Sequence, residues 1–143
     1  MTTEFDFENK TVLLNSGYEM PVLGLGTWTQ DDETAEKSVY EALKDGYRLI
    51  DTAQYYGNET GVGSGHTQEL FGNETIMDIA KDHGKTPAQV ILRWHLQAGY
   101  ITIPGSQNSD HILENYSIFD FELTDEEMQR MAEFHTGQRY ENW

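Results

Sequence analysis

The chain has 143 residues, with 9 Lys or Arg against 25 Asp or Glu, and a formal net charge of −16 at pH 7. This acidic balance repels phosphate backbones and anionic lipid, so it argues against nucleic acid and membrane surfaces as partners. The chain has no cysteine for disulfide or thiol chemistry, no basic and apolar leader, and no stretch near the ~20 apolar residues of a membrane span. We expect a single domain, 1–143, in the cytoplasm.

The first third of the chain predicts a hairpin, a strand, a helix and a second strand, in that order. Short alternating apolar runs flank the turn residues of NSGYEM, which is typical of a hairpin. The strand VLGLG comes next. Asp31 or Asp32 then caps a helix with apolar residues at helical spacing, and Gly46 ends it. The segment YRLIDTA is apolar on both faces up to Ile50, as expected of a covered parallel strand.

The remainder of the chain predicts four helices and one strand. Asn73 caps a short helix that Gly84 ends. Thr86 has the capping-box spacing to Gln89, and Thr124 has the same spacing to Glu127. The strand YITIP and a helix from about 109 lie between these two capping boxes. Alternating strands and helices predict an α/β protein with a parallel sheet.

One helix face and one set of histidines need separate interpretation. Val90, Leu92 and Trp94 are expected to form the helix face that packs on the sheet. His83, His95 and His111 have carboxylates nearby, but no pair of them has the i, i+4 spacing with a third ligand that a metal site requires, so no metal is expected.

Four segments carry a family resemblance. GLGTW, LIDTAQYYGNETGVG, GKTPAQVILRWHLQAG and IPGSQNSDHILENYSIFDFELTDEEM resemble, in order, signature segments of the aldo-keto reductases. These are NAD(P)H-dependent carbonyl reductases built on a TIM barrel. Because such a barrel takes about 250 residues, a chain of 143 residues implies that much of it is missing.

The resemblance also locates the missing part. Residues through Gly63 resemble the opening hairpin and barrel strands 1 and 2, and residues from about Gly65 resemble the family's segments after strand 7. We therefore expect a partial (β/α)8 barrel with strands 1, 2 and 8 in the order 2, 1, 8, and a junction near 61–67. An ordinary glycine-rich turn in a small α/β fold is the alternative for that junction.

The implied catalytic groups are only partly present. By resemblance, Asp51 and Tyr56 match the family's catalytic aspartate and its general acid, whereas the family's lysine and histidine belong to absent strands. A carboxylate raises the pKa of a neighbouring phenol above its usual value of about 10, so Tyr56 beside Asp51 is expected to stay protonated at pH 7. His66 could lie near the strand ends, although a solvated loop residue is the more ordinary interpretation.

The loop after the YITIP strand is the predicted cofactor site. Backbone N–H groups and the helix dipole at a helix start can hold a phosphate. By resemblance, Ser106, Gln107 and Asn108 would lie along the adenosine phosphate, and Glu114 and Asn115 would contact the adenine of NADPH or NADH. Gly105 and His111 stand where NADPH-preferring members have lysine and arginine, which removes the counter-charges for a 2′-phosphate. A purely structural helix cap is the alternative for this loop.

Two functional hypotheses arise from these residues. The first is a reductase of small aldehydes or ketones that uses Tyr56 as general acid, with Trp28 lining the substrate pocket; a partly buried rim aromatic is the alternative for Trp28. The second is a catalytically inactive, internally deleted remnant that keeps fold segments and some cofactor binding. In either case open sheet edges favour a homo-oligomer, in which elements could be exchanged between chains.

Overall fold

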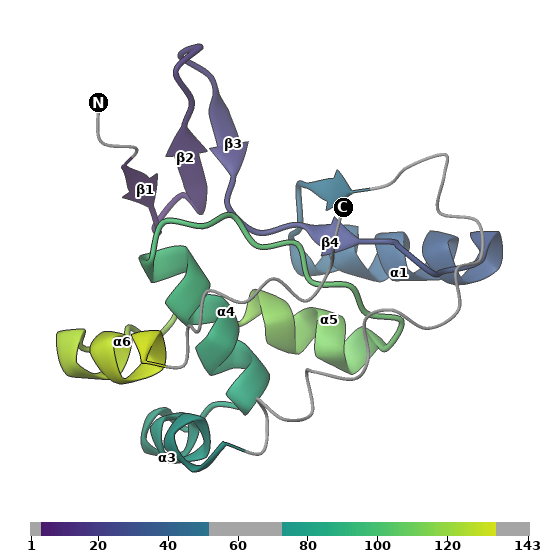
Figure 1. The fold of residues 1–143 in the computed structure, drawn as a ribbon. Coiled ribbons are helices and arrows are strands. Elements are labelled where there is room, and N and C mark those ends of the chain that lie inside the picture. Colours follow the sequence, from purple (N-terminus) through teal and green to yellow (C-terminus); the bar gives the residue numbers. More distant parts are fainter. Residues whose placement is uncertain (1–3, 52–72, 134–143) are drawn as a thin grey trace, which may run out of the picture.

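The computed structural model describes residues 4–51 and 73–133 (Figure 1). The predicted general acid Tyr56, the alternative His66 and the predicted junction 61–67 lie outside the described residues.

The chain begins with a small antiparallel sheet. β1 (Phe5–Asp6) pairs with β2 (Thr11–Leu13), and β2 pairs with β3 (Glu19–Pro21) in the register Val12 to Met20. Gly17, at φ +84°, supplies the left-handed position of the turn between β2 and β3. The predicted hairpin is confirmed, and β1 is an additional strand that the sequence pattern did not indicate.

A parallel layer of three segments comes after the hairpin. β4 (Leu25–Gly26) pairs with β5 (Ile50–Asp51), and isolated parallel bridges join Leu23 to Thr102 and Gly26 to Gly105. The spatial order is therefore β5, β4 and the 102–105 segment, which matches the expected order 2, 1, 8. The predicted YITIP strand forms only these bridges, because Pro104 has no N–H to extend a ladder.

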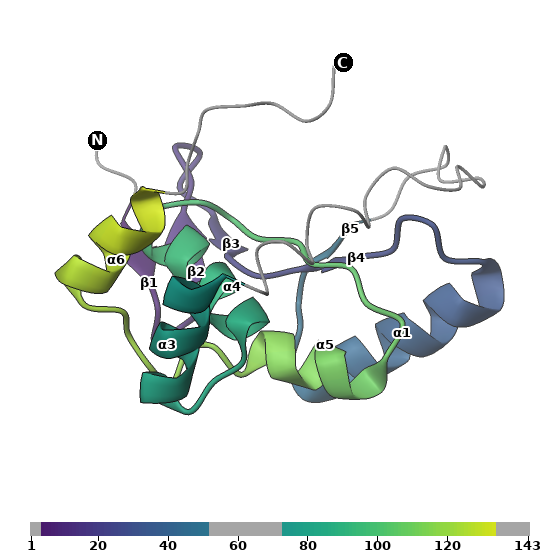
Figure 2. The same cartoon turned by 60° about the horizontal axis from the view of Figure 1, so that its bottom comes forward.

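Two helices lie side by side against this layer (Figure 2). α1 (Asp32–Asp45) is capped by the Asp31 side chain and ends at Gly46, which adopts φ +108°. α5 (Ser109–Tyr116) packs along it. Tyr47, just past α1, donates its hydroxyl to the Ile112 carbonyl at 2.9 Å. Both residues belong to the core cluster that also contains Val22, Leu23 and Leu25.

A second core lies among three further helices. α3 (Glu74–His83), α4 (Pro87–Gln97) and α6 (Asp125–Ala132) surround a cluster of the apolar residues Ile76, Ile79, Ala80, Val90, Leu123 and Met131. The expectation that Val90 and Trp94 pack on the sheet is wrong, because both contact this helical core. The Trp94 indole also donates to the Met128 carbonyl of α6 at 3.1 Å. Leu92 does pack against the core cluster of the sheet.

The helices are short and mixed in polarity. In the described part of the chain, none has the length and apolar character that crossing a membrane would require.

Candidate active site

The carboxyl ends of the three parallel segments meet at one edge of the layer. The Thr27 N–H donates to the Asp51 carbonyl at 3.1 Å, and the Thr27 hydroxyl donates to the same oxygen at 2.9 Å. Thr27 is buried and Asp51 is half-buried. This pair of hydrogen bonds fixes the predicted catalytic aspartate at the end of β5, directly beside the end of β4.

Two glycines allow the third segment to approach this edge. A Cβ atom on Gly26 would lie 3.1 Å from the Ile103 carbonyl oxygen, and one on Gly105 would lie 3.2 Å from the Gly26 carbonyl oxygen. Such contacts are tighter than ordinary van der Waals packing. The absence of side chains at both positions therefore lets the loop after Gly105 start against β4.

That loop leads into the start of α5, as the cofactor hypothesis requires. The Asn108 side chain accepts a hydrogen bond from the Asp110 N–H at 2.8 Å, so it caps the helix. The Ser106 hydroxyl accepts from the Asn108 N–H at 3.2 Å. Ser106 and Asn108, which were both predicted to lie along the phosphate, thus shape the loop. Asn108 also caps the helix, which is the purely structural role given above as the alternative for this loop.

Gln30, which follows β4, forms a hydrogen bond to the loop before α5. Its Nε2 donates to the Ser106 carbonyl at 3.0 Å across a separation of 76 residues. Its Oε1 is buried and has no hydrogen-bond partner among the described residues. A buried acceptor of this kind can take a hydrogen bond from a bound hydroxyl or amide, which fits a nucleotide lying along the loop.

The remaining predicted cofactor residues lie on the loop and along α5. Gln107, His111 and Glu114 are exposed, whereas Asn115 is buried. The Glu114 carbonyl accepts a hydrogen bond from Nε2 of Gln89 at 2.9 Å. Gln89 is buried and holds the end of α5 against α4. The first turn of α5 carries the acidic Asp110, which adds negative rather than positive charge near a bound phosphate.

Trp28 stands immediately after the edge. It is 46% exposed, and the next residue, Thr29, has φ +66°, an uncommon conformation for a β-branched residue. Strained backbone is frequent at ligand-binding sites. The position fits both interpretations of Trp28, the pocket wall and the rim aromatic.

Several of the described lysines and histidines are engaged away from this edge. Lys44 pairs with Glu41 at 3.2 Å, and Lys85 pairs with Asp120 at 2.7 Å. His83 contacts Glu127 at 3.0 Å. None of these groups stands in for the family's lysine or histidine. Within the residues that the structure describes, no three metal-ligating side chains gather in one place.

Sequence reasoning missed the roles of Gln30 and Gln89. Each donates to a carbonyl far away in the sequence, and no local motif marks such a long-range bond. The capping box at Thr86 identified Gln89, but only for its bond to the Thr86 N–H at 3.0 Å.

A sequence model described as "Aldo/keto reductase family" matches this chain in two stretches, residues 22–74 and 62–136. The chain belongs to the aldo/keto reductase family. Similar proteins include 9,11-endoperoxide prostaglandin H2 reductase of Trypanosoma cruzi (strain CL Brener), 44% identical over 54% of this chain and 28% of that protein. An aldo-keto reductase of Mycolicibacterium smegmatis (strain ATCC 700084 / mc(2)155) is 39% identical over 69% of this chain and 34% of its own length. This aldo/keto reductase chain thus spans about a third or less of these two relatives.

Solved structures of the family share its fold. An aldo-keto reductase from a Medee basin deep-sea metagenome library superposes with a TM-score of 0.84 over 92% of this chain and 97% of that chain, at 20% identity. A Gox0644 mutant in complex with NADPH gives a TM-score of 0.75 over 86% and 92% of the two chains, at 21% identity. The architecture is therefore that of a partial TIM barrel.

Proposed function

We propose that this chain is an NAD(P)H-dependent oxidoreductase that reduces small aldehydes or ketones in the cytoplasm, with Tyr56 as general acid. The observation that carries the proposal is the shared edge of the parallel layer. There Asp51 lies at the end of β5, beside β4, and the same edge carries the loop that begins α5. Family membership supports the reaction class.

The residues of this edge fit the phosphate side of the cofactor. Because Gly26 and Gly105 have no side chains, β4 and the start of the loop pack closely, and we call this close-packed backbone the phosphate cradle. The start of α5 offers N–H groups to a phosphate. NADPH or NADH would supply the hydride when bound. One solved relative is an NADPH complex. Since Gly105 and His111 bring no lysine or arginine to a 2′-phosphate, we propose that NADH is accepted at least as well.

The proton must come from the protein. A general acid protonates the carbonyl oxygen as negative charge develops on it, and such groups contribute about 10²–10⁴-fold in rate. A tyrosine beside the Asp51 carboxylate keeps its proton at pH 7, so it can donate in the reduction direction. The reverse oxidation needs a tyrosinate base and should be slower.

A second candidate function is an inactive remnant that retains cofactor binding. It is favoured by the short coverage of the relatives and by the two overlapping family matches, 22–74 and 62–136. These matches meet close to the segment 61–67, where we propose the junction of a missing central part. A remnant of this kind would keep the loop chemistry of Ser106 and Asn108 without turnover.

The deciding experiment measures NADH and NADPH oxidation by absorbance over a panel of small aldehydes and ketones. We expect Tyr56→Phe to lower turnover at least ~100-fold. Tyr18→Phe is the matched control, because Tyr18 is an exposed hairpin residue. Calorimetric titration with both nucleotides separates the candidates. Binding without Tyr56-dependent turnover supports the remnant, and absence of both turnover and binding rejects both functions.

A further inference from the structure

A separate cavity of about 150 Å³ lies at the opposite end of β4 from the candidate active site. It is bounded by the turn between β1 and β2, by Pro21 at the end of β3, by the residues after α1 and by the end of α5. The hairpin runs directly into β4 from this side (Figure 1). The cavity therefore shares no lining residue with the edge that holds Asp51.

The charge of this cavity is opposite to that of the chain. Lys10 and Arg48 line it, and its described lining contains no carboxylate, although the chain has 25 acidic residues and only 9 Lys and Arg. If charged residues were distributed at random, acidic residues would outnumber basic ones in the lining by more than two to one. Two cations without a carboxylate in the lining favour an anionic ligand.

Lys10 is held in position by an aromatic ring. Its Nζ donates to the Tyr116 hydroxyl at 3.0 Å and lies 4.1 Å from the centroid of the same ring. The Tyr116 hydroxyl in turn donates to the Gly46 carbonyl at 3.1 Å. An ammonium has three protons, so one bond to Tyr116 leaves others for a ligand. The backbone of Lys10 is at φ +59°, a conformation that non-glycine residues seldom adopt.

Arg48 supplies the second cation. Its Nη1 donates to the carbonyls of Leu43 and Tyr47, at 3.2 Å and 2.6 Å. These bonds hold the side chain at the end of α1. In the described part of the chain they use only one of the guanidinium nitrogens, so the planar group keeps donors for a carboxylate.

Apart from the two cations, the lining combines the polar Asn9 and Thr11 with an apolar part. Pro21, Leu23 and Phe119 contribute apolar walls, and Leu23 is buried. A cavity of about 150 Å³ is the size that accepts one benzene ring. A dianion or a large ligand is disfavoured, because Glu8 and Asp120 line an adjoining groove that shares Lys10, Tyr116 and Phe119 with the cavity.

We propose that this cavity binds a small carboxylate with one aromatic ring, for which benzoate is the probe. The ring lies against Leu23 and Phe119, and the carboxylate faces Lys10 and Arg48. Because the lining contains no residue of the edge that holds Asp51, we expect benzoate to bind without cofactor or substrate.

The test uses the full chain and three ligands of nearly the same shape: benzoate, benzyl alcohol and benzylamine. Titrations are monitored by isothermal calorimetry and by amide chemical shifts. We expect saturable benzoate binding, at least ~10-fold weaker binding of benzyl alcohol, and no benzylamine binding. Shift changes should centre on residues 9–11 and 46–48.

Variants locate the site. Lys10→Met and Arg48→Met should each weaken benzoate binding at least ~10-fold, whereas Lys37→Met, an exposed lysine of α1, should leave it unchanged. Circular dichroism checks the fold of each variant. If Lys10→Met and Arg48→Met fail to fold, the order of the three ligands on the wild-type chain decides. Absent benzoate binding, equal affinity for benzyl alcohol, or equal weakening by Lys37→Met would overturn the proposal.

Discussion

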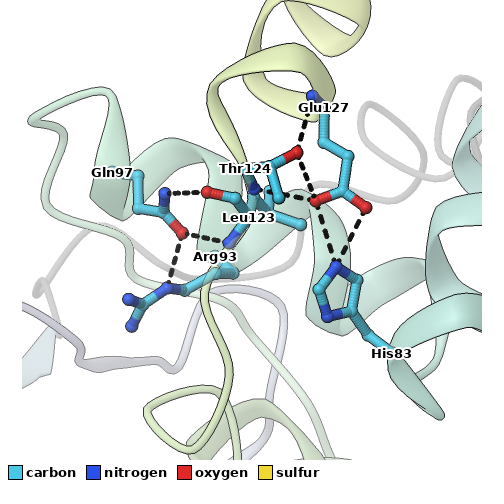
Figure 3. Close-up of polar contacts among 6 residues, drawn as sticks. All are labelled: His83, Arg93, Gln97, Leu123, Thr124 and Glu127. Carbon is cyan, nitrogen blue, oxygen red and sulfur yellow. Dashed lines mark hydrogen bonds and ion pairs between the residues drawn. The ribbon is translucent and has the colours of Figure 1, made fainter.

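His83 of α3 and Glu127 of α6 are joined by contacts of 3.0 Å and 3.1 Å between Nε2 and the two carboxylate oxygens (Figure 3). The same carboxylate accepts from the Thr124 N–H at 2.8 Å and so completes the capping box of α6. One side chain therefore both starts α6 and fixes it against α3.

This arrangement makes stability depend on pH. Burial raises the pKa of Glu127, but hydrogen bonds from the Thr124 N–H, His83 and the Thr124 hydroxyl together hold it below the ordinary value of 4.5. A lowered folded-state pKa gives stability that is present above the unfolded-state pKa and lost as the pH falls through the folded value. We expect Glu127→Gln to cost about 1 kcal/mol at pH 7 and almost nothing at a pH of about 2.5.

Urea unfolding across this pH range measures the difference between wild type and Glu127→Gln. Glutamine is also accepted in a capping box, so the substitution removes the charge rather than the cap. Glu126→Gln is the control, because Glu126 is exposed in the same turn. A cost for Glu127→Gln that persists unchanged at the acidic end of the range would contradict the prediction.

Gln97 connects a buried guanidinium to the chain before α6. Its Oε1 accepts from Arg93 Nε and from the Leu123 N–H, both at 2.8 Å, and its Nε2 donates to the Leu123 carbonyl at 2.9 Å. Burial lowers the pKa of Arg93, and the cation lies over the Phe7 ring. Replacing Gln97 by Leu leaves the Arg93 guanidinium and the Leu123 backbone groups without these hydrogen bonds. We therefore expect the free energy of unfolding to fall by about 2–3 kcal/mol.

Thermal and urea unfolding test this loss. Gln129→Leu is the matched control, because Gln129 is an exposed glutamine on α6. Equal stability of the two variants would show that the Gln97 bonds contribute nothing net.

Comparison of Gly26→Ala with Gly24→Ala separates an effect on stability from an effect on nucleotide binding. The added Cβ meets the Ile103 carbonyl, so the segment that leads into α5 must shift, and we expect about 1–3 kcal/mol of destabilisation together with loss of nucleotide binding. In Gly24→Ala the Cβ meets the Leu49 side chain at 2.8 Å. That variant should lose stability while keeping nucleotide affinity, as measured by calorimetry. The same nucleotide affinity in both variants would contradict the proposal that the close packing of Gly26 against the segment before α5 shapes the phosphate site.

The exposed edge at Ile103 is expected to make the chain self-associate. Ile103 is 41% exposed on the outer segment of the layer, and no hydrogen bond between described backbone groups involves it. An open apolar edge favours pairing with a second copy, and a charge on the edge prevents it. We expect sedimentation velocity to show an oligomer that Ile103→Lys converts to monomer.

Leu113→Lys is the control for charge, because Leu113 is 49% exposed on α5 rather than on the edge. A wild-type monomer, or dissociation by both variants, would refute the edge as the interface.

The helices were predictable because their signals are local. Asn73, Thr86 and Thr124 each cap a helix through a bond that spans two or three residues. Strand extent was not predictable, because pairing depends on a distant partner and on Pro104. Asp51 and the loop at Ser106 could be assigned to one edge through the family resemblance, which implies the strand order 2, 1, 8, since carboxyl ends of parallel strands share an edge. Gln30 was not found, because its partner is remote.

The Gln30–Ser106 bond has a kinetic consequence. Its 76-residue span means that the two sides of the candidate site come together only after a long loop closes. Loop-closure entropy grows slowly, by about 0.6 kcal/mol per doubling of length, so shortening or lengthening the connection alters equilibrium stability little. Folding speed is more sensitive, because non-local pairing must wait for closure. We therefore expect the hairpin and the helical pair α3–α4 to form before the parallel layer.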